Sequence, residues 1–119
     1  KAGLSGAKTK SIKDLARHVT RGDLDPSMFT DQSNEEITQA LTQVWGIGEW
    51  SAQMHLMFSL GRLDVWPVLD LGVRNGWAKF QRCVPPTAKG LVPLGDGYRP
   101  YRSVLAWYMW RVHDVDDWV

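Results

Sequence analysis

The most regular feature of this 119-residue chain is the spacing of its apolar residues. In two segments near the N-terminus they recur every three or four positions, which places them on one face of an amphipathic helix. The first segment predicts a helix from Ser5 to about Thr20, and the second predicts a helix from Ser33 to about Val44. The apolar positions are Ile12, Leu15, Ala16 and Val19 in the first segment and Ile37, Ala40, Leu41 and Val44 in the second.

Local signals mark where helices begin in this half of the chain. Ser33-Asn-Glu-Glu36 has the spacing of a capping box, with serine at the N-cap and glutamate three positions later. In the polar connection 21–32, Asp25-Pro26 has the order of a cap followed by a first-turn proline. We therefore expect a short helical turn in that connection.

The second half of the chain also predicts helices. A strongly apolar helix is expected over about 49–60, and Gly61 follows it as a terminating residue. Another helix starts near Asp70 and runs to about Gln81. A last long helix covers about 101–113.

Loops are expected between these helices. Residues 62–69 have the composition of an extended loop that Pro67 stiffens, and 83–97 contain three prolines and three glycines. We expect 83–97 to be mostly loop with one weak helical turn. No strand pattern is longer than Val65-Trp66, so the sequence predicts a single all-α domain over residues 1–119.

A glycine hairpin at 45–50 is the first candidate for chemistry. Two helices are joined by Trp45-Gly-Ile-Gly48, and the glycines permit positive φ and a close approach of a phosphate to the backbone. Ile47 is expected to turn inward between the helices. The N–H groups that open the second helix form an anion-binding site with a favourable dipole. An ordinary helical hairpin, in which glycine is only a C-cap, explains the same pattern equally well.

Composition narrows the choice of partners. The net charge is only +1, although residues 1–22 carry six basic side chains against one acid and residues 23–64 carry seven acids against one base. A DNA-binding role would therefore rely on backbone N–H groups and helix N-termini rather than on a broad basic face. The single cysteine, Cys83, excludes a disulfide framework and a thiolate metal cluster, and we expect a buried or half-buried thiol. No apolar run is long enough to span a membrane.

Asp70 is the second candidate for chemistry. It lies one helix downstream of the glycine hairpin, in Asp64-Val-Trp-Pro-Val-Leu-Asp-Leu-Gly-Val-Arg74. A fixed carboxylate can stabilise the positive charge that develops on a sugar when its glycosidic bond breaks, and it can orient or deprotonate a water molecule. Asp70 is also placed as a plain helix N-cap, and the two roles are compatible.

Three segments resemble the HhH-GPD superfamily of DNA glycosylases. Leu41-x-x-Val44-x-Gly-Ile-Gly-x-Trp50-Ser-Ala52 is similar to their helix-hairpin-helix, and Arg62 to Arg74 is similar to the segment with their catalytic aspartate. Arg99-Pro-Tyr-Arg-Ser-Val-Leu-Ala-Trp-Tyr-Met-Trp-Arg111 resembles the C-terminal helix of the 3-methyladenine DNA glycosylase II branch. The resemblance runs from Gly3 onward. It implies an all-α helix-hairpin-helix glycosylase fold, incomplete at the N-terminus.

The resemblance also implies roles for individual residues. Asp70 matches the catalytic aspartate. The base pocket is implied at Trp50 and Trp110 and at Met54, where some relatives have tyrosine. Phosphate binding is implied at Gly46, Gly48, Trp50 and Ser51. The backbone carbonyls of Thr42, Val44 and Ile47 match positions that hold a monovalent cation, Na⁺ or K⁺, and no other cofactor is expected.

The reaction that the resemblance implies is hydrolysis. Bifunctional relatives use a lysine at the position that Trp50 occupies here, so a Schiff-base lyase step is not expected. The single cysteine excludes the four-cysteine iron–sulfur cluster of other relatives. The expected activity is release of alkylated bases, such as 3-methyladenine, from duplex DNA during base excision repair.

Other readings stay open at this point. The chain can be a non-catalytic DNA-binding module, or an inactive fragment, since its first residue is Lys1 and the N-terminal half of the fold has no counterpart. We expect no membrane partner and a monomeric complete protein, cytoplasmic in a bacterium or nuclear in a eukaryote. Arg99 and Arg102 can reach either phosphate or carboxylates.

Overall fold

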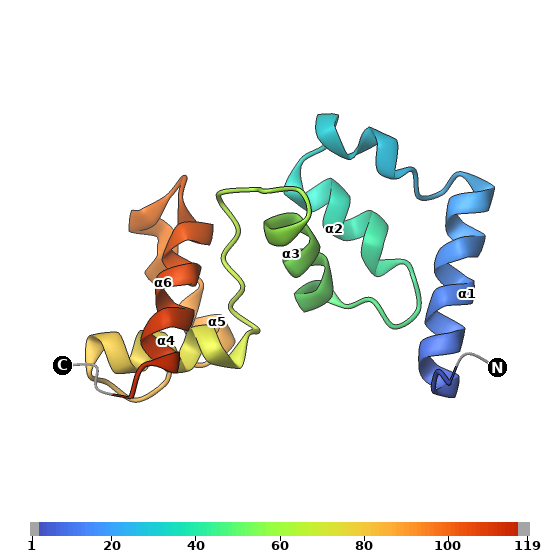
Figure 1. The fold of residues 1–119 in the computed structure, drawn as a ribbon. Helices are drawn as coiled ribbons and strands as arrows, with labels where there is room; N and C mark the ends of the chain where they lie inside the picture. The colour runs from blue at the N-terminus through green and yellow to red at the C-terminus, as the bar shows by residue number, and fades with distance from the viewer. Residues whose placement is uncertain (1–2, 117–119) are drawn as a thin grey trace. The chain divides into compact units, whose positions relative to one another are not determined.

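A computed structural model describes residues 3–116, and these residues form helices and loops with no strand (Figure 1). This confirms the predicted all-α class. The α-helices are α1 Gly6–Arg21, α2 Asn34–Thr42, α3 Glu49–Phe58, α4 Leu71–Gln81, α5 Ala88–Leu91 and α6 Arg102–Asp114. Two 3-10 helices, η1 Pro26–Asp31 and η2 Pro93–Tyr98, complete the described elements.

The chain divides into two compact units, each with its own buried apolar residues. The first unit runs up to His55 and the second begins at Leu56, so α3 continues across the boundary. The prediction of a single domain stays a prediction. The first unit buries Leu24, Phe29, Ile37, Leu41, Val44 and Ala52, and the second buries a larger set that includes Leu56, Met57, Val65, Trp66, Val73, Trp77, Leu91, Leu105 and Met109.

The local signals in the first unit act as predicted. Ser33 and Glu36 form both bonds of the capping box, and the Asp25 side chain accepts from the N–H of Ser27 at 3.0 Å to open η1. The first helix also forms, but none of its side chains is buried, and Ile12 and Val19 are exposed. The apolar stripe of α1 therefore specifies a helix without a fully buried side chain, although Leu15 lines an apolar pocket with Leu24 and Phe29.

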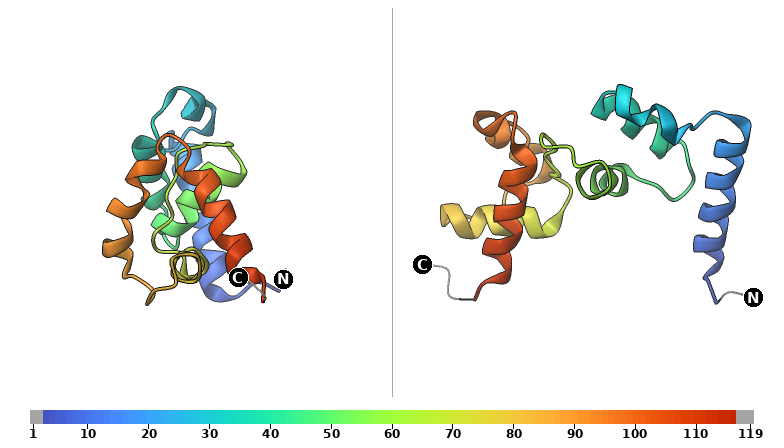
Figure 2. Two further views of the ribbon diagram at one scale, coloured as in Figure 1. Left: turned by 90° about the vertical axis from the view of Figure 1, so that its left-hand side faces the viewer. Right: turned by 45° about the horizontal axis from the view of Figure 1, so that its top comes forward.

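The second unit is organised around the crossing of α4 and α6 (Figure 2). The two backbones approach most closely at Gly76, where an added Cβ would lie 2.0 Å from the carbonyl oxygen of Met109. Only glycine fits a contact of this kind, because any side chain would enter the neighbouring backbone. Val73 and Trp77 on α4 and Leu105 and Met109 on α6 are all buried in this unit.

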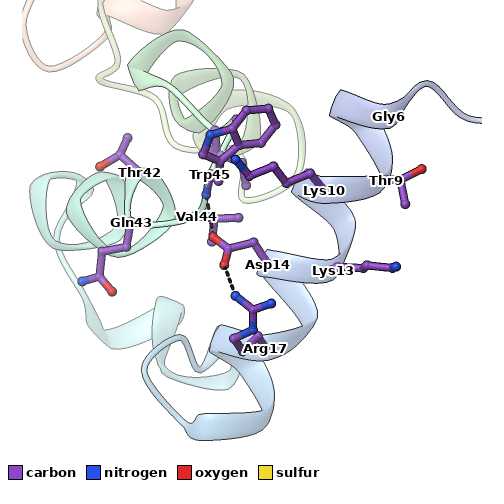
Figure 3. A pocket seen from close by; sticks show the side chains of 12 residues that line it. Gly6, Thr9, Lys10, Lys13, Asp14, Arg17, Thr42, Gln43, Val44 and Trp45 are labelled. Carbon is purple, nitrogen blue, oxygen red and sulfur yellow. Dashed lines mark hydrogen bonds and ion pairs between the residues drawn. The ribbon is translucent and has the colours of Figure 1, made fainter.

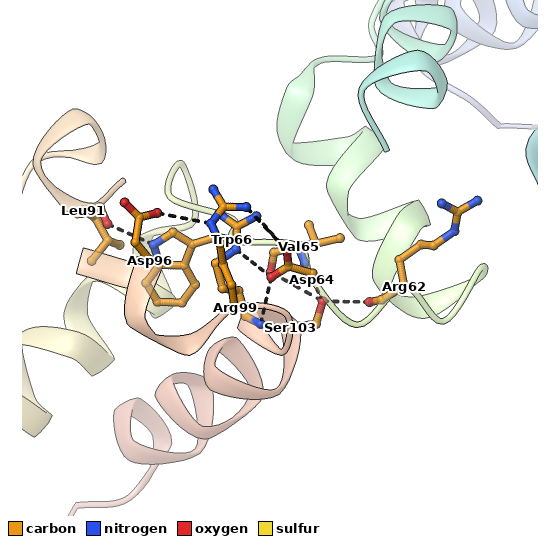
Figure 4. Close-up of polar contacts among 9 residues, drawn as sticks. Arg62, Asp64, Val65, Trp66, Leu91, Asp96, Arg99 and Ser103 are labelled. Carbon is orange, nitrogen blue, oxygen red and sulfur yellow. Dashed lines mark hydrogen bonds and ion pairs between the residues drawn. The ribbon is translucent and has the colours of Figure 1, made fainter. Parts of the chain in front are cut away.

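The loop that leads to α4 is fixed by one buried serine (Figure 4). The Ser103 hydroxyl donates to the carbonyl of Arg62 at 2.7 Å and accepts from the N–H of Val65 at 2.9 Å. The N–H of Ser103 also donates to the carbonyl of Leu63 at 2.9 Å. These bonds satisfy polar groups that the extended loop would otherwise bury without partners.

Two predictions for residues 83–97 were wrong. The stretch is not mostly loop, because Thr87 caps α5 through the N–H of Gly90 and η2 follows with proline in its first turn. The indole N–H of Trp66 donates to the carbonyl of Leu91 at 2.9 Å, and this long-range bond helps to hold α5. Cys83 is exposed rather than buried, and it follows Arg82, the left-handed residue that ends α4.

Candidate functional site

Asp70 lies at the N-terminus of α4, half-buried in the second unit. Its Oδ2 accepts a hydrogen bond from the N–H of Val73 at 2.9 Å, so the capping role suggested by the sequence is confirmed. A carboxylate at this end of a helix interacts favourably with the helix dipole. Capping also fixes the side chain, which is the condition for a carboxylate that acts on a bound substrate.

A tryptophan from the other end of the unit binds the same carboxylate oxygen. The indole Nε1 of Trp110, on α6, donates to Oδ2 of Asp70 at 2.7 Å. An added Cβ at Gly72 would lie 3.0 Å from Cδ1 of Trp110 and 3.1 Å from Oδ2 of Asp70, so glycine allows the two side chains to meet. The structure thus brings together two residues that the sequence assigned to different parts of the site.

Phe58 is a further aromatic residue at this position. Its ring stacks on Trp110 with centroids 5.7 Å apart and an interplanar angle of 27°, yet the side chain is 64% exposed. The sequence pattern includes Phe58 in the strongly apolar helix predicted over about 49–60. It marks no functional role for Phe58, since an apolar residue at helical spacing looks the same whether it faces a core or an open site.

An ion-pair network holds the loop that precedes Asp70 (Figure 4). Arg102 donates through Nε to Oδ1 of Asp64 at 2.7 Å and through a terminal nitrogen to Oδ2 at 3.1 Å. These bonds hold the pKa of the Asp64 carboxyl below its ordinary value. Arg99 lies 3.6 Å from Asp64 and 3.5 Å from Asp96, so both arginines bind carboxylates.

The glycine hairpin belongs to the first unit. Gly46 has φ of +86°, a left-handed conformation that favours glycine. The helix α2 ends at Thr42, two residues earlier than predicted, because the N–H of Val44 turns back to the carbonyl of Leu41. The N–H of Ile47 then donates to the carbonyl of Val44, and Ile47 lines an apolar pocket as expected.

Several backbone donors of the hairpin remain available. Among residues 3–116, no acceptor is recorded for the N–H groups of Gly46, Gly48 and Glu49, and the first bond of α3 is from Ala52 to the carbonyl of Gly48. Ser51 is exposed in the same turn. Adjacent N–H groups at the start of a helix are suited to a phosphate group.

The residues expected to form the base pocket come from both units. Trp50, 46% exposed, and half-buried Met54 lie on the part of α3 in the first unit, and Trp110 lies on α6 in the second. Of these residues, Trp110 donates a hydrogen bond to Asp70.

The described residues show no side-chain metal centre. None of their His, Cys, Asp and Glu side chains forms a group of three that could hold an ion. The three residues whose carbonyls are expected to bind a monovalent cation, Thr42, Val44 and Ile47, all line one groove beside the hairpin. No described helix is both long and apolar enough to cross a membrane.

No family model matches the chain. Among curated proteins it is 36% identical over 118 residues to DNA-3-methyladenine glycosylase 1 of Schizosaccharomyces pombe, which covers 98% of the chain and 52% of that relative. It is 32% identical over 119 residues to the DNA-3-methyladenine glycosylase of Saccharomyces cerevisiae, covering 98% of the chain and 40% of the relative. The chain spans about half the length, or less, of these curated relatives.

Two solved structures share the fold. The Schizosaccharomyces pombe 3-methyladenine DNA glycosylase, solved in complex with abasic DNA, superposes with a TM-score of 0.88 at 35% identity, over 98% of this chain and 58% of that one. A DNA-3-methyladenine glycosidase from Bacillus halodurans gives a TM-score of 0.88 at 34% identity, over 96% of this chain and 53% of that one. The comparisons of sequence and of structure therefore both identify DNA-3-methyladenine glycosylases as similar proteins.

Proposed function

We propose that this chain, a homologue of the DNA-3-methyladenine glycosylases over about half of their length, contributes a catalytic carboxylate and a DNA-binding hairpin to a monofunctional DNA glycosylase. One observation carries the proposal. Asp70, at the position of the family's aspartate, is held by a backbone donor from Val73 and an indole donor from Trp110.

The reaction would use Asp70 as an anion beside the sugar. Breaking the bond between a base and its sugar builds positive charge on the sugar, and a fixed carboxylate stabilises that charge. The same group can orient or deprotonate the water that attacks the sugar carbon. An alkylated purine already carries positive charge, so it leaves with its electron pair without needing a strong acid.

Water is the expected nucleophile. Trp50 occupies the position at which bifunctional relatives have a lysine, and no lysine lies between Lys13 and Lys79. A Schiff base between protein and sugar needs an amine at the site. The proposed reaction is therefore hydrolysis, which releases the base and leaves an abasic site.

The hairpin would hold the DNA strand beside the lesion. Extruding a base from the duplex costs a few kcal/mol, and contacts to phosphate and aromatic rings offset that cost. The N–H groups of Gly46 and Gly48 are the proposed phosphate ligands, with Trp50 and Ser51 next in the turn. We expect Trp50, Met54 and Trp110 to contact the extruded base.

A monovalent cation fits the carbonyl groups at the hairpin. Oxygen atoms are the ligands that such hard cations prefer, and no described donor is recorded for the carbonyls of Thr42 and Ile47, while Val44 already accepts one bond. A bound Na⁺ or K⁺ would add positive charge next to a DNA phosphate. The expected partner is duplex DNA with a damaged base, and the complete protein is expected to be a monomer.

The test is base release from methylated duplex DNA. It is measured with the chain alone and with a version extended at its N-terminus, each unsubstituted and as Asp70→Asn. Asparagine caps helices about as well as aspartate, so the variant keeps α4 but loses the charge. We expect Asp70→Asn to bind DNA and to release no base.

Two outcomes contradict the proposal. Release of methylated bases by Asp70→Asn at the unsubstituted rate removes Asp70 from the chemistry. If neither the chain alone nor the N-terminally extended version releases base while both bind DNA, a non-catalytic DNA-binding module is the better description.

A further inference from the structure

A groove of about 830 Å³ lies between the first helix and the glycine hairpin, within the first unit (Figure 3). One wall is a single face of α1, and the other is the turn from Thr42 to Ile47. The α1 residues recur every three or four positions, so they form one stripe along the helix. The stripe consists of Gly6, Thr9, Lys10, Lys13, Asp14 and Arg17.

The groove carries an excess of positive charge. Three of its lining residues are cationic, and Asp14 is its only acid. Asp14 is already engaged, because one oxygen accepts from the N–H of Trp45 at 2.8 Å and the other pairs with Arg17 at 3.1 Å. Neither Lys10 nor Lys13 has an ion-pair partner among residues 3–116.

Asp14 also fixes the hairpin against α1. Its bond to the N–H of Trp45 crosses 31 positions of sequence, and it lowers the pKa of the Asp14 carboxyl together with the nearby cations. The Trp45 ring is 44% exposed, and the ammonium of Lys10 lies 4.1 Å from its centroid. This cation–π contact holds the Lys10 charge over the hairpin wall of the groove.

We infer that this groove binds the DNA strand at a phosphate next to the one held by the hairpin amides, with Lys10 and Lys13 as its ligands. The inference rests on the proposed function. Phosphates of one strand follow each other about every 3.4 Å along the helix axis, so a strand held at Gly46 and Gly48 has further phosphates nearby. The hairpin residues that would bind the first phosphate continue into the wall of the groove.

The binding contributed by each lysine is measurable through salt dependence. Neutralising one phosphate releases counterions and changes the slope of log K against log salt by about 0.9. Because both lysines are proposed to bind one phosphate, Lys10→Gln with Lys13→Gln should reduce the slope for an abasic-site duplex by about 0.9. If the plots of log K against log salt for the two proteins meet at 1 M salt, the affinity of the double variant at 0.1 M salt should be roughly eightfold lower.

The experiment compares the unsubstituted chain, the Lys10→Gln/Lys13→Gln variant and Lys89→Gln. Lys89 is an exposed lysine on α5 outside the groove, so its variant controls for the loss of charge alone. Binding is followed by fluorescence anisotropy across a salt series. Circular dichroism establishes that each variant keeps its helices, and inorganic phosphate without DNA is a second probe.

The supporting result is a slope that falls only in the double variant, with no saturable binding of inorganic phosphate. Equal salt slopes in all three proteins overturn the inference that the groove binds DNA. They do not affect the proposed role of Asp70 in base release. If the unsubstituted chain binds inorganic phosphate saturably and the double variant does not, the groove is a site for free anions. That result also overturns the inference. Absence of base release with the expected slopes contradicts the proposed function and leaves the groove as a DNA contact.

Discussion

The indole N–H of Trp110 and the carboxylate of Asp70, 40 positions apart in sequence, are joined by a hydrogen bond of 2.7 Å. The bond links α6 to the first turn of α4 and ends on the oxygen that already accepts from Val73. Two donors on one oxygen restrict rotation of the carboxylate about its side chain. The orientation of Asp70 therefore depends on the packing of two helices as well as on its local cap.

Trp110→Phe should lower base release without a matching loss of DNA affinity. The phenyl ring keeps an aromatic surface against Phe58 but has no N–H to donate to Asp70. A hydrogen bond to a charged group is worth about 1.5–3 kcal/mol, so the rate falls roughly ten- to a hundredfold if the bond acts fully in the transition state. Single-turnover base release and anisotropy with the same duplex measure the two quantities separately.

The matched control for this variant is Trp107→Phe. Trp107 lies on the same helix, is 42% exposed and makes no recorded bond to Asp70. If both variants release base at the unsubstituted rate, the Trp110 bond is structural only. If both lose DNA affinity equally, the effect belongs to α6 as a whole.

Local features of this site were predictable from sequence, whereas its long-range partners were not. The Asp70 cap, the Ser33 capping box and the Gly46 turn each depend on residues within a few positions. The bond from Trp110 to Asp70 depends on how α4 crosses α6, and helical periodicity fixes which face is apolar without fixing which helix it meets.

The segment 83–97 shows that composition alone does not predict short helices reliably. Its prolines and glycines predicted loop, yet Pro93 begins η2 and Gly95 lies beside Trp66, where an added Cβ would be 2.6 Å from the indole nitrogen. Each residue type that usually interrupts a helix is used here for a first turn or for close packing. Composition alone cannot distinguish these uses.

Gly76→Ala should destabilise the second unit. The added methyl group would lie 2.0 Å from the carbonyl oxygen of Met109, so α4 and α6 must separate. Overpacking of this kind costs about 1–3 kcal/mol, or more where backbone must move. Urea unfolding followed by tryptophan fluorescence measures the loss, and Gly97→Ala, whose added Cβ meets nothing within 4 Å, should have a much smaller effect. Equal midpoints for the two variants would refute the close crossing.

Gly48→Ala should weaken DNA binding without destabilising the fold. An added Cβ at Gly48 meets nothing within 4 Å, but it would lie on a backbone that we expect to approach a phosphate. We expect about a tenfold loss of affinity, which is about 1.4 kcal/mol. At Gly46, in contrast, φ is +86° and the Cβ would be 3.0 Å from Oγ of Ser11, so Gly46→Ala should lower stability as well. Unchanged affinity in Gly48→Ala argues against a phosphate at this turn.

The pair between Asp64 and Arg102 should make the second unit sensitive to acid. Arg102 holds the pKa of the Asp64 carboxyl below its ordinary 3.8, so the ionised form is favoured in the folded state. A lowered folded pKa contributes stability that is present above about pH 3.8 and is lost as pH falls through the folded value. The unsubstituted chain should therefore lose stability more steeply below pH 3.8 than Asp64→Asn does.

Above pH 5 the same variant should be the less stable protein. Asparagine cannot reproduce the two-point bond to Arg102, and a charge-assisted bond is worth about 1.5 kcal/mol at the lower end of its range, which suits a pair that is partly exposed to solvent. Urea unfolding from pH 2.5 to 7 measures both effects, with Asp114→Asn as the control because Asp114 is exposed at the end of α6. The two stability curves should converge as Asp64 becomes protonated, and a constant gap between them across this pH range would show that the bond does not depend on the charge of Asp64.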